Sequence, residues 1–188
     1  MAQNGFYLGG GTAIALMLGH RKSNDLDWFS ESSLGDPNSW NEKIEGEKVS
    51  LKRITVDKGT LHARANGVRV SLLEYRYPRL HTLVKWKDMG FTMASLDDLA
   101  CMKLSAIVSR GMKKDFVDIY ALMSKHKSLQ QMLRLYQKRF SVTDIFPVLR
   151  GLSYFDDAER ERMPRMIWNV RWHAMRTAIL TAVKDSLP

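Results

Sequence analysis

The pattern of apolar and polar residues near the N-terminus predicts a strand, a tight turn and a helix in close succession. Residues 6–8 form a short apolar run that stops at three glycines, residues 9–11. A helix is expected next, because the apolar residues between 13 and 17 recur at the spacing of one helical face. Thr12 is suited to cap the start of this helix, and Gly19 is suited to end it.

Alternating and β-branched residues in the next part of the chain predict strands. Residues 25–29, Asp-Leu-Asp-Trp-Phe, alternate polar and apolar positions, as a strand with one buried face does. Residues 31–46 are rich in Ser, Gly, Asp, Asn and Pro and are expected to form a surface loop with at most one helical turn. Strands are also expected within residues 49–56 and 60–78, with a hairpin turn at Asn66-Gly67.

From Ser95 onward the pattern becomes helical. Ser95 and Asp98 form a start that resembles a capping box, and apolar residues at helical spacing continue to a break at Gly111. A second helix is expected from Lys114 to about Lys125. Further helices are expected within residues 128–140, 143–151 and 157–186, where Pro147 and Pro164 restrict where each helix can start.

These elements predict an α/β (α+β) fold. A small mixed β-sheet, with the helix of the glycine turn against it, is expected to occupy residues 1–95. A C-terminal helical lobe is expected to occupy residues 96–188. The order of strands followed by helices is typical of such an architecture.

Composition narrows the class of protein. The 188 residues are 45% hydrophobic, which is enough for a sizeable core, and the single cysteine, Cys101, lies in an apolar run typical of core packing. No stretch resembles a signal peptide or approaches the roughly 20 apolar residues of a membrane span, so we expect a cytoplasmic protein with no membrane partner. The formal net charge of +9 favours a polyanionic partner such as RNA, although other basic proteins bind no nucleic acid.

The glycine triplet is a candidate phosphate site. Backbone N–H groups at the start of a helix, together with the positive end of the helix dipole, bind phosphate. Two better-known phosphate loops are excluded. The sequence lacks the Gly-Lys-Ser/Thr of the Walker pattern, and it has Ile14 where the dinucleotide-binding fingerprint needs a glycine. Taken alone, the triplet favours a purely structural turn.

Asp25 and Asp27 are a candidate metal site. Two positions apart on a predicted strand, they direct both carboxylates to one face, roughly 6 to 7 Å apart at the backbone. Mg²⁺ prefers oxygen ligands and takes one or two carboxylates plus substrate phosphates. Leu26 and Trp28 would then face the core. An isolated Asp-x-Asp is more often a solvated strand face, so its neighbours decide its meaning.

The combination of these features changes the interpretation. A glycine turn that opens a helix, then Arg21 and Ser23, then the acid pair converge on one edge of one sheet. The stretch "GGGTAIALMLGHRKSNDLDWFS" resembles the nucleotidyltransferase superfamily that includes DNA polymerase beta, and more narrowly the AbiEii/AbiGii family of abortive-infection toxins. Residues 98–122, "DLACMKLSAIVSRGMKKDFVDIYAL", are similar to that family's helical segment with a Lys, an Arg and a Lys/Arg-Asp-x-x-Asp.

The residues of this second segment also have simpler interpretations. Lys103 has apolar neighbours one turn away on both sides, so it is either a lysine that extends to solvent or a point charge for nucleotide phosphates. Asp115 and Asp118 share one helix face, and Asp118 is also spaced to pair with Lys114 in an ordinary salt-bridge ladder. The resemblance favours a place in the site for Lys103 and Asp118.

The resemblance implies transfer of a nucleoside monophosphate from an NTP to an acceptor, with release of pyrophosphate. It implies that Lys103 steadies the pyrophosphate and that Asp118 orients or deprotonates the acceptor hydroxyl. The other implied roles are Mg²⁺ or Mn²⁺ ligation by Asp25 and Asp27, and nucleotide binding by Gly10, Gly11, Thr12, Arg21 and Ser23. Lys114 and Asp115 are secondary candidates beside these residues.

One carboxylate of the superfamily is absent. The acid expected on a later strand falls at Ser71 in this sequence, and Glu74 is a substitute candidate. Without that acid, a single metal ion or the recruitment of Asp118 is expected.

The resemblance further implies a bacterial toxin or phage-defence role with a separately encoded antitoxin. RNA such as tRNA is the expected acceptor, in agreement with the positive charge. Two alternatives stay open: a nucleotidyltransferase that modifies a protein, and a non-catalytic nucleotide- or RNA-binding module.

Histidines and aromatic residues add less. The five histidines show no metal-ligand spacing with the lone cysteine, which makes a zinc site improbable, and His20 is placed to reach a phosphate. In the last predicted helix, basic and aromatic residues recur at spacings of three and four, which is typical of core packing, with stacking on unpaired bases as the alternative. These residues are Arg165, Trp168, Trp172 and Arg176.

Overall fold

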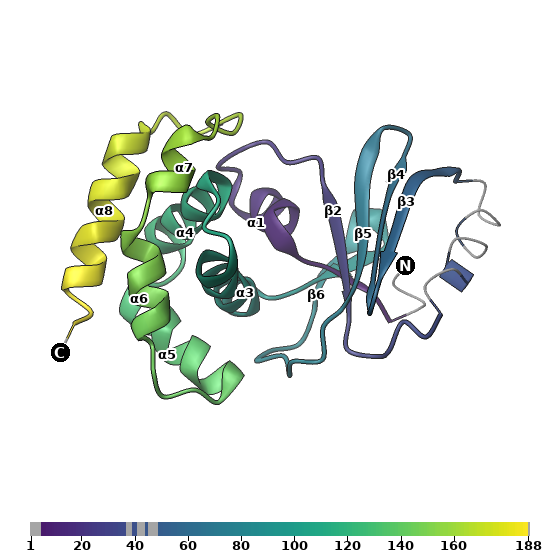
Figure 1. Ribbon diagram of the computed structural model, residues 1–188, viewed down its shortest axis with the longest axis horizontal. Helices are drawn as coiled ribbons and strands as arrows, with labels where there is room; N and C mark the ends of the chain where they lie inside the picture. The colour runs from purple at the N-terminus through teal and green to yellow at the C-terminus, as the bar shows by residue number, and fades with distance from the viewer. Residues whose placement is uncertain (1–4, 37–38, 41–43, 45–48, 188) are drawn as a thin grey trace.

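A seven-stranded mixed sheet with helices gathered at one side makes up the computed structural model (Figure 1), which describes residues 5–36, 39–40, 44 and 49–187. The strands, in the sheet order β3-β4-β5-β2-β1-β7-β6, are β1 (Tyr7–Leu8), β2 (Leu26–Ser30), β3 (Leu51–Asp57), β4 (Thr60–Ala65), β5 (Val68–Glu74), β6 (Val84–Trp86) and β7 (Phe91–Met93). The helices are α1 (Gly10–Leu18), α3 (Leu96–Ser109), α4 (Lys113–Lys125), α5 (Leu129–Phe140), α6 (Phe146–Ser153), α7 (Asp156–Arg160) and α8 (Trp172–Lys184), with a 3₁₀ turn η2 (Lys87–Met89). The expected α/β class with a mixed sheet is confirmed.

The strands predicted around the glycine turn and the hairpin are confirmed. β1 pairs antiparallel with β2, and β2 pairs parallel with β5. Asn66 and Gly67 have φ values of +50° and +82°, which is the left-handed pair that a two-residue type I′ hairpin turn requires. The last predicted strand ends earlier than expected, at Glu74. The predicted loop at 31–46 lies partly outside the described residues, so its helical turn stays a prediction.

Two strands and the turn between them were not predicted. Residues 79–94 contain β6, η2 and β7, and β7 pairs parallel with β1 through Leu8 and Met93. Each strand has only three residues, which is too short for alternation to stand out from a loop.

The first helix of the C-terminal part follows its predicted start signal, and a later helix has a cap that was not predicted. Ser95 accepts a hydrogen bond from the Asp98 N–H at 3.1 Å, which caps α3 as expected. Ser128 and Gln131 form a complete capping box at the start of α5. Cys101 is fully buried in α3, which confirms its predicted place in the core.

The prediction of a helix within residues 157–186 is wrong for residues 161–171, which separate two helices. α7 ends at Arg160 and α8 begins at Trp172, and the chain between them is not helical. Pro164 has no N–H to donate, and the segment instead pairs with residues 20–22: the Lys22 N–H donates to the Arg165 carbonyl at 2.8 Å. The predicted stripe of four basic and aromatic residues on one helix is therefore also wrong, because only its last two members lie on α8.

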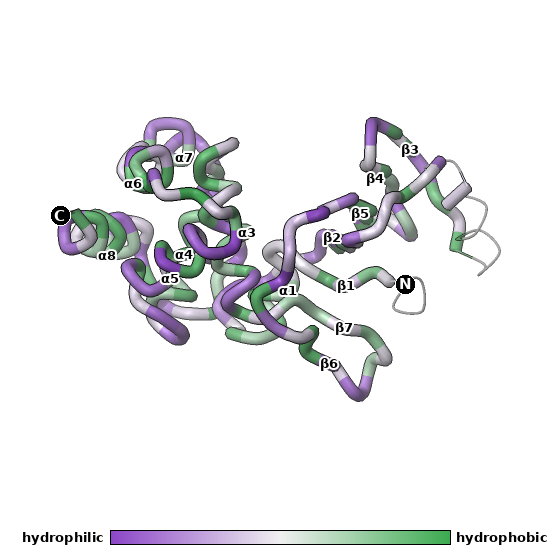
Figure 2. The backbone as a smooth tube through the Cα atoms, turned by 90° about the horizontal axis from the view of Figure 1, so that it is seen from below, coloured by the Kyte–Doolittle hydropathy of each residue, from purple (hydrophilic) through white to green (hydrophobic). Residues whose placement is uncertain are grey.

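The helix α1 lies between the sheet and the other helices (Figure 2). It contacts both α3 and α4, and its residues Thr12, Ala13 and Ile14 are buried. The glycine turn before α1 therefore stands where the sheet and the helical part meet. In the described part of the chain, no helix is both long and apolar enough to cross a membrane.

Candidate active site

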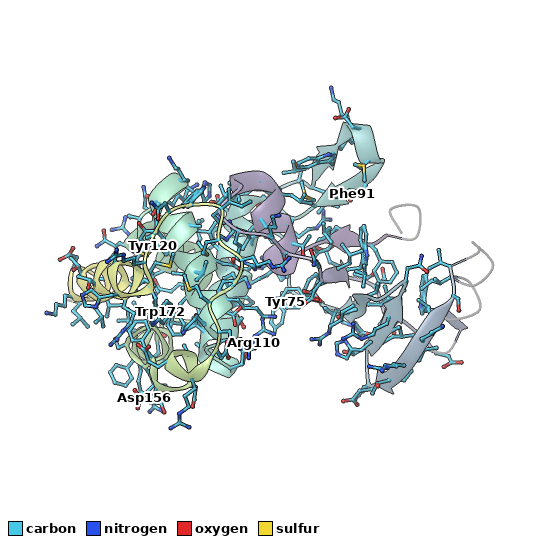
Figure 3. The ribbon with its side chains drawn as sticks, turned by 90° about the horizontal axis from the view of Figure 1, so that it is seen from above. Tyr75, Phe91, Arg110, Tyr120, Asp156 and Trp172 are labelled. Carbon is cyan, nitrogen blue, oxygen red and sulfur yellow. The ribbon has the colours of Figure 1, made fainter. Side chains whose placement is uncertain are left out.

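A pocket of about 510 Å³ opens at the junction of the sheet with the helices. Arg110 from the helical side and Tyr75 from the sheet side both line it, and both lie near the centre of the molecule (Figure 3). Most of the predicted site residues also line this pocket: Gly10, Gly11, Thr12, Arg21, Ser23, Asp25, Asp27, Lys103 and Lys114. Residues from two distant parts of the sequence, such as Asp25 and Lys114, therefore share one cavity, as the two motifs predicted.

The glycine turn is packed too closely for side chains. Gly10 has a φ of +62°, and a Cβ there would lie 2.7 Å from Asp27 Oδ2. A Cβ on Gly11 would overlap the guanidinium of Arg21 and would lie 3.1 Å from Asp118 Oδ2. The Gly9 N–H donates to the Asp27 carbonyl at 2.9 Å, so the turn is fixed directly against β2. The N-terminus of α1 and the acid pair are thus held side by side.

Thr12 does not cap α1, contrary to the expectation. The helix begins at Gly10 and its N-cap position is Gly9, which places Thr12 in the first turn. The Thr12 hydroxyl is hydrogen-bonded to Ser23 Oγ at 2.8 Å and donates to the Asp25 carbonyl. Thr12 therefore joins the start of the helix to the segment that carries Asp25.

Asp25 and Asp27 both reach the pocket. The side chain of Asp25 is 44% exposed, and its Oδ2 lies 3.9 Å from Lys114 Nζ. Asp27 lies on β2 and Asp25 immediately precedes that strand. Among the described residues no group of three or more His, Cys, Asp or Glu side chains is placed to hold a metal ion. The two aspartates are consequently an oxygen donor pair open to solvent, which suits a metal that completes its shell with substrate phosphates.

The later strand supplies no third acid. β2 and β5 run parallel with Asp27 opposite Ser71, so Ser71 occupies the position next to the acid pair. Glu74 is three residues further on and therefore points to the other face of the sheet. There it pairs with Arg76 at 2.5 Å and accepts from the Leu34 N–H at 3.2 Å. Glu74 as a substitute third acid is wrong for this reason.

Asp118 is the centre of a buried ionic cluster. Its side chain has no exposed surface and accepts from His20 Nε2 at 2.8 Å, Arg21 Nε at 2.7 Å and Lys103 Nζ at 2.8 Å. Burial alone would raise the pKa of Asp118, but Lys103, His20 and Arg21 outweigh burial and hold that pKa well below its ordinary value. A carboxylate enclosed in this way cannot take a proton from an acceptor that enters from solvent, so the expected role of Asp118 at the acceptor hydroxyl does not fit. The ladder with Lys114 is also absent, because Lys114 faces Asp25 instead.

Lys103 and Asp115 complete this cluster, which we call the Asp118 cluster (His20, Arg21, Lys103, Arg110, Asp115 and Asp118). Lys103 Nζ donates to Asp115 Oδ1 at 2.7 Å, and Arg110 Nε donates to Asp115 Oδ2 at 2.9 Å. Burial would lower the pKa of Lys103, yet the two carboxylates raise it above its ordinary value. Lys103 is only 4% exposed, so it is not a lysine that extends to solvent. His20 is fully buried, so it does not reach a phosphate in the pocket.

The family model for "Nucleotidyl transferase AbiEii toxin, Type IV TA system" matches residues 2–187. The chain belongs to the AbiEii nucleotidyltransferase toxin family. It is therefore a nucleotidyltransferase of a toxin-antitoxin context, and the resemblance proposed from the two sequence motifs is confirmed.

The chain is also similar to individual known proteins in sequence and in structure. An uncharacterized protein of Aquifex aeolicus (strain VF5) is 40% identical over 161 residues, which are 84% of this chain and 77% of that protein. The crystal structure of JHP933 from Helicobacter pylori has a TM-score of 0.58 at 15% identity, over 97% of this chain and 83% of that one. The nucleotidyltransferase toxin MenT4 from Mycobacterium tuberculosis H37Rv has a TM-score of 0.50 at 15% identity, over 97% and 76%. At these identities the two solved structures support the fold.

Several residues of this AbiEii-family pocket were not predicted individually. Lys22, Arg69 and Arg165 line it, and among the described residues none of them forms an ion pair. His62 and Ser71 lie on the sheet side. Lys22 is next to a predicted residue and Arg165 follows Pro164, but only the pairing of residues 20–22 with the 161–171 segment brings these two cations together.

The tight glycine turn gives a first prediction. In an ordinary exposed helix, replacing Gly by Ala stabilises by about 0.5–1 kcal/mol. Gly11→Ala is expected to do the opposite, because the new methyl group displaces the Arg21 guanidinium from the Asp118 cluster. Urea denaturation of both proteins measures this sign. A stabilised variant would contradict the close packing of Gly11 and Arg21.

The Asp118 cluster predicts a plateau of stability against pH. The pKa values of Asp115 and Asp118 lie below their ordinary value of 3.8, so the stability they contribute is complete above that pH and is lost as the pH falls further. The pKa of Lys103 lies above its ordinary value of 10.5, so its contribution is complete below that pH and is lost as the pH rises further. The urea midpoint of wild type should fall at both extremes. Asp118→Asn should weaken the acid-side fall, and an unchanged acid-side slope would contradict the assignment.

Proposed function

We propose that the protein transfers a nucleoside monophosphate from an NTP to an RNA acceptor, such as tRNA, in a reaction that requires Mg²⁺ or Mn²⁺. The observation that carries this proposal is the convergence of the N-terminus of α1, the Asp25–Asp27 pair and unpaired cations on one pocket. Helix N-termini and cations bind phosphate, and paired carboxylates bind the metal that accompanies it. The family supports the reaction class, and the acceptor and the metal belong to the proposal.

The metal would be held by Asp25 and Asp27. Their carboxylates form an accessible pair of hard oxygen ligands, which is the donor set that Mg²⁺ or Mn²⁺ shares with substrate phosphates. When bound, the metal neutralises charge on the phosphates during transfer.

The remaining residues bind and orient the triphosphate. The N–H groups of Gly10 and Gly11 line one side of the pocket, where they suit the β- and γ-phosphates. The hydroxyls of Thr12 and Ser23 are bonded to one another and to the Asp25 carbonyl, so these two residues hold the turn beside the phosphates in place. Lys103 uses two of its three ammonium hydrogens on Asp115 and Asp118, which leaves one donor for a phosphate oxygen. In the reaction, the acceptor oxygen forms a bond to the α-phosphorus while the bond from that phosphorus to the bridging oxygen breaks, and pyrophosphate leaves.

Asp118 has a positioning role in this proposal. It joins the segment after α1, through His20 and Arg21, to α3, through Lys103. Loss of Asp118 would release the cations that flank the glycine turn. Arg21 likewise acts through its two-point contact with Asp118, at 2.7 Å from Nε and 2.9 Å from Nη2.

RNA is the proposed acceptor because the pocket rim is positive. The exposed Lys22, Arg69 and Arg165 have no acidic partner among the described residues, and the chain carries a net charge of +9. Such a surface attracts a polyanion through counterion release. A separately encoded antitoxin is the proposed genetic partner, and phage defence through abortive infection is the proposed context.

Two alternatives compete with this proposal. A protein acceptor would use the same basic rim for docking, and a non-catalytic nucleotide- or RNA-binding module would need only the phosphate site. The absence of a third acid beside Asp27 motivates the second alternative.

The test is incubation of the purified protein with each α-labelled NTP, Mg²⁺ and either total tRNA or cell protein. The proposal predicts label on RNA, dependent on the metal and absent with the Asp25→Ala and Asp27→Ala variants. Label on protein alone would show that the acceptor is a protein and not RNA. Label on neither, with NTP binding intact, would establish the non-catalytic alternative.

A further inference from the structure

The acceptor hydroxyl must lose a proton during transfer, and the carboxylates near the pocket are not free to take it. Asp25 and Asp27 are assigned to the metal. Asp115 and Asp118 are fully buried in ion pairs, and Glu74 lies on the opposite face of the sheet. A proton acceptor in this pocket therefore has to come from another residue type.

Tyr75 also lines the pocket but is unsuited to the task. Its hydroxyl is buried, and burial raises the pKa of Tyr75 far above its ordinary value. The cationic lining residues have no lone pair available while they remain charged. Among the described lining residues, His62 is the one whose side chain type ordinarily exchanges a proton near neutral pH.

His62 is also oriented by a neighbour. Its Nδ1 is hydrogen-bonded to Ser71 Oγ at 3.0 Å, and Ser71 is only 1% exposed. The register of the sheet connects this contact to the acid pair. Asp27 on β2 is opposite Ser71 on β5, and Ser71 is opposite His62 on β4. Asp27, Ser71 and His62 therefore form a row across three neighbouring strands. The row begins at the acid pair and ends at Nε2 of His62, which has no hydrogen-bond partner among the described residues.

We propose that His62 is the general base for the acceptor hydroxyl and that Ser71 is its positioning residue. This inference rests on the proposed function. With Nδ1–H donated to Ser71 Oγ, Nε2 carries the lone pair that accepts the proton. The acceptor O–H bond breaks, its proton moves to Nε2, its oxygen bonds to the α-phosphorus, and pyrophosphate leaves with the electron pair of the broken P–O bond.

The charged surroundings of His62 come from four elements and from the opposite wall. Acidic and basic side chains are both present, so the surroundings of the His62 imidazole do not have a single sign of charge. These groups are Arg64 on β4, Arg69 on β5, Arg53 and Asp57 on β3, Asp27 on β2, and Arg110 and Lys114 across the pocket.

The experiment compares label transfer and NTP affinity in wild type, His62→Gln and the control His173→Gln. His173 is exposed on α8, away from the pocket. We expect His62→Gln to lower the transfer rate by about 10²-fold or more while NTP affinity stays unchanged. The control should match wild type.

Two further variants separate a base from a structural histidine. Ser71→Ala should lower the transfer rate while NTP affinity stays unchanged, because Nδ1 loses the partner that orients the imidazole. In the His62→Gln background, Ser71→Asp should restore part of the rate, because a carboxylate opposite Asp27 can accept the proton instead. Neither effect is expected if His62 only supports the fold.

The outcomes also separate this inference from the proposed function. Transfer that is lost in Asp27→Ala but intact in His62→Gln would overturn the role of His62 alone. A loss of NTP affinity equal to the loss of rate in His62→Gln would overturn it too, since His62 would then bind the nucleotide. Wild-type protein that transfers no label to any acceptor would overturn both proposals.

Discussion

Replacing Asp27 by Asn is expected to lower the rate of nucleotidyl transfer by about 10³-fold, because the amide lacks the charge that, in the proposed function, would hold the metal against the triphosphate. The variant should fold normally. Asp27 is only partly buried, and its carbonyl, which accepts from the Gly9 N–H, is unchanged. The measurement is the initial rate of α-label transfer at saturating NTP and Mg²⁺.

A matched control is Asp88→Asn, since Asp88 is exposed in η2 and outside the pocket. This control should transfer label at the wild-type rate. An Asp27→Asn protein that retains most of its rate would show that the acid pair does not hold the catalytic metal.

The second large effect is on stability. Asp118→Ala is expected to lower the free energy of unfolding by about 3–5 kcal/mol, because it leaves Arg21 buried without its carboxylate and Lys103 with only one of its two. Urea denaturation followed by circular dichroism measures this loss.

An exposed aspartate provides the comparison. Asp185 follows α8 at the surface, and Asp185→Ala should change the free energy of unfolding by about 0.5 kcal/mol or less. Equal effects of the two substitutions would contradict the central place of Asp118 in the buried cluster.

Local signals made much of the fold predictable. Ser95 and Asp98 fixed the start of α3, and Asn66-Gly67 fixed the hairpin, because each depends on residues within three positions of one another. The glycine turn and the acid pair were predictable for the same reason, and both line the pocket. The roles assigned to these residues, and the division of the chain at residue 95, remain predictions.

Long-range pairing was not predictable from the sequence. Helical spacing placed Asp115 and Asp118 on one face, but it contained no information that Asp118 meets Arg21, 97 positions earlier. Glu74 failed as a site residue because one step of strand alternation turned it away from Ser71. The last predicted helix failed at Pro164 because residues 165–168 pair with the chain after α1.

The most direct measurement uses the same NTP labelled at the α-phosphate in one reaction and at the γ-phosphate in another. Nucleotidyl transfer through this pocket predicts α-label in the RNA and γ-label only in released pyrophosphate, with both signals lost in Asp27→Asn. Label from the γ-phosphate in the acceptor, or release of orthophosphate without α-label transfer, would contradict it.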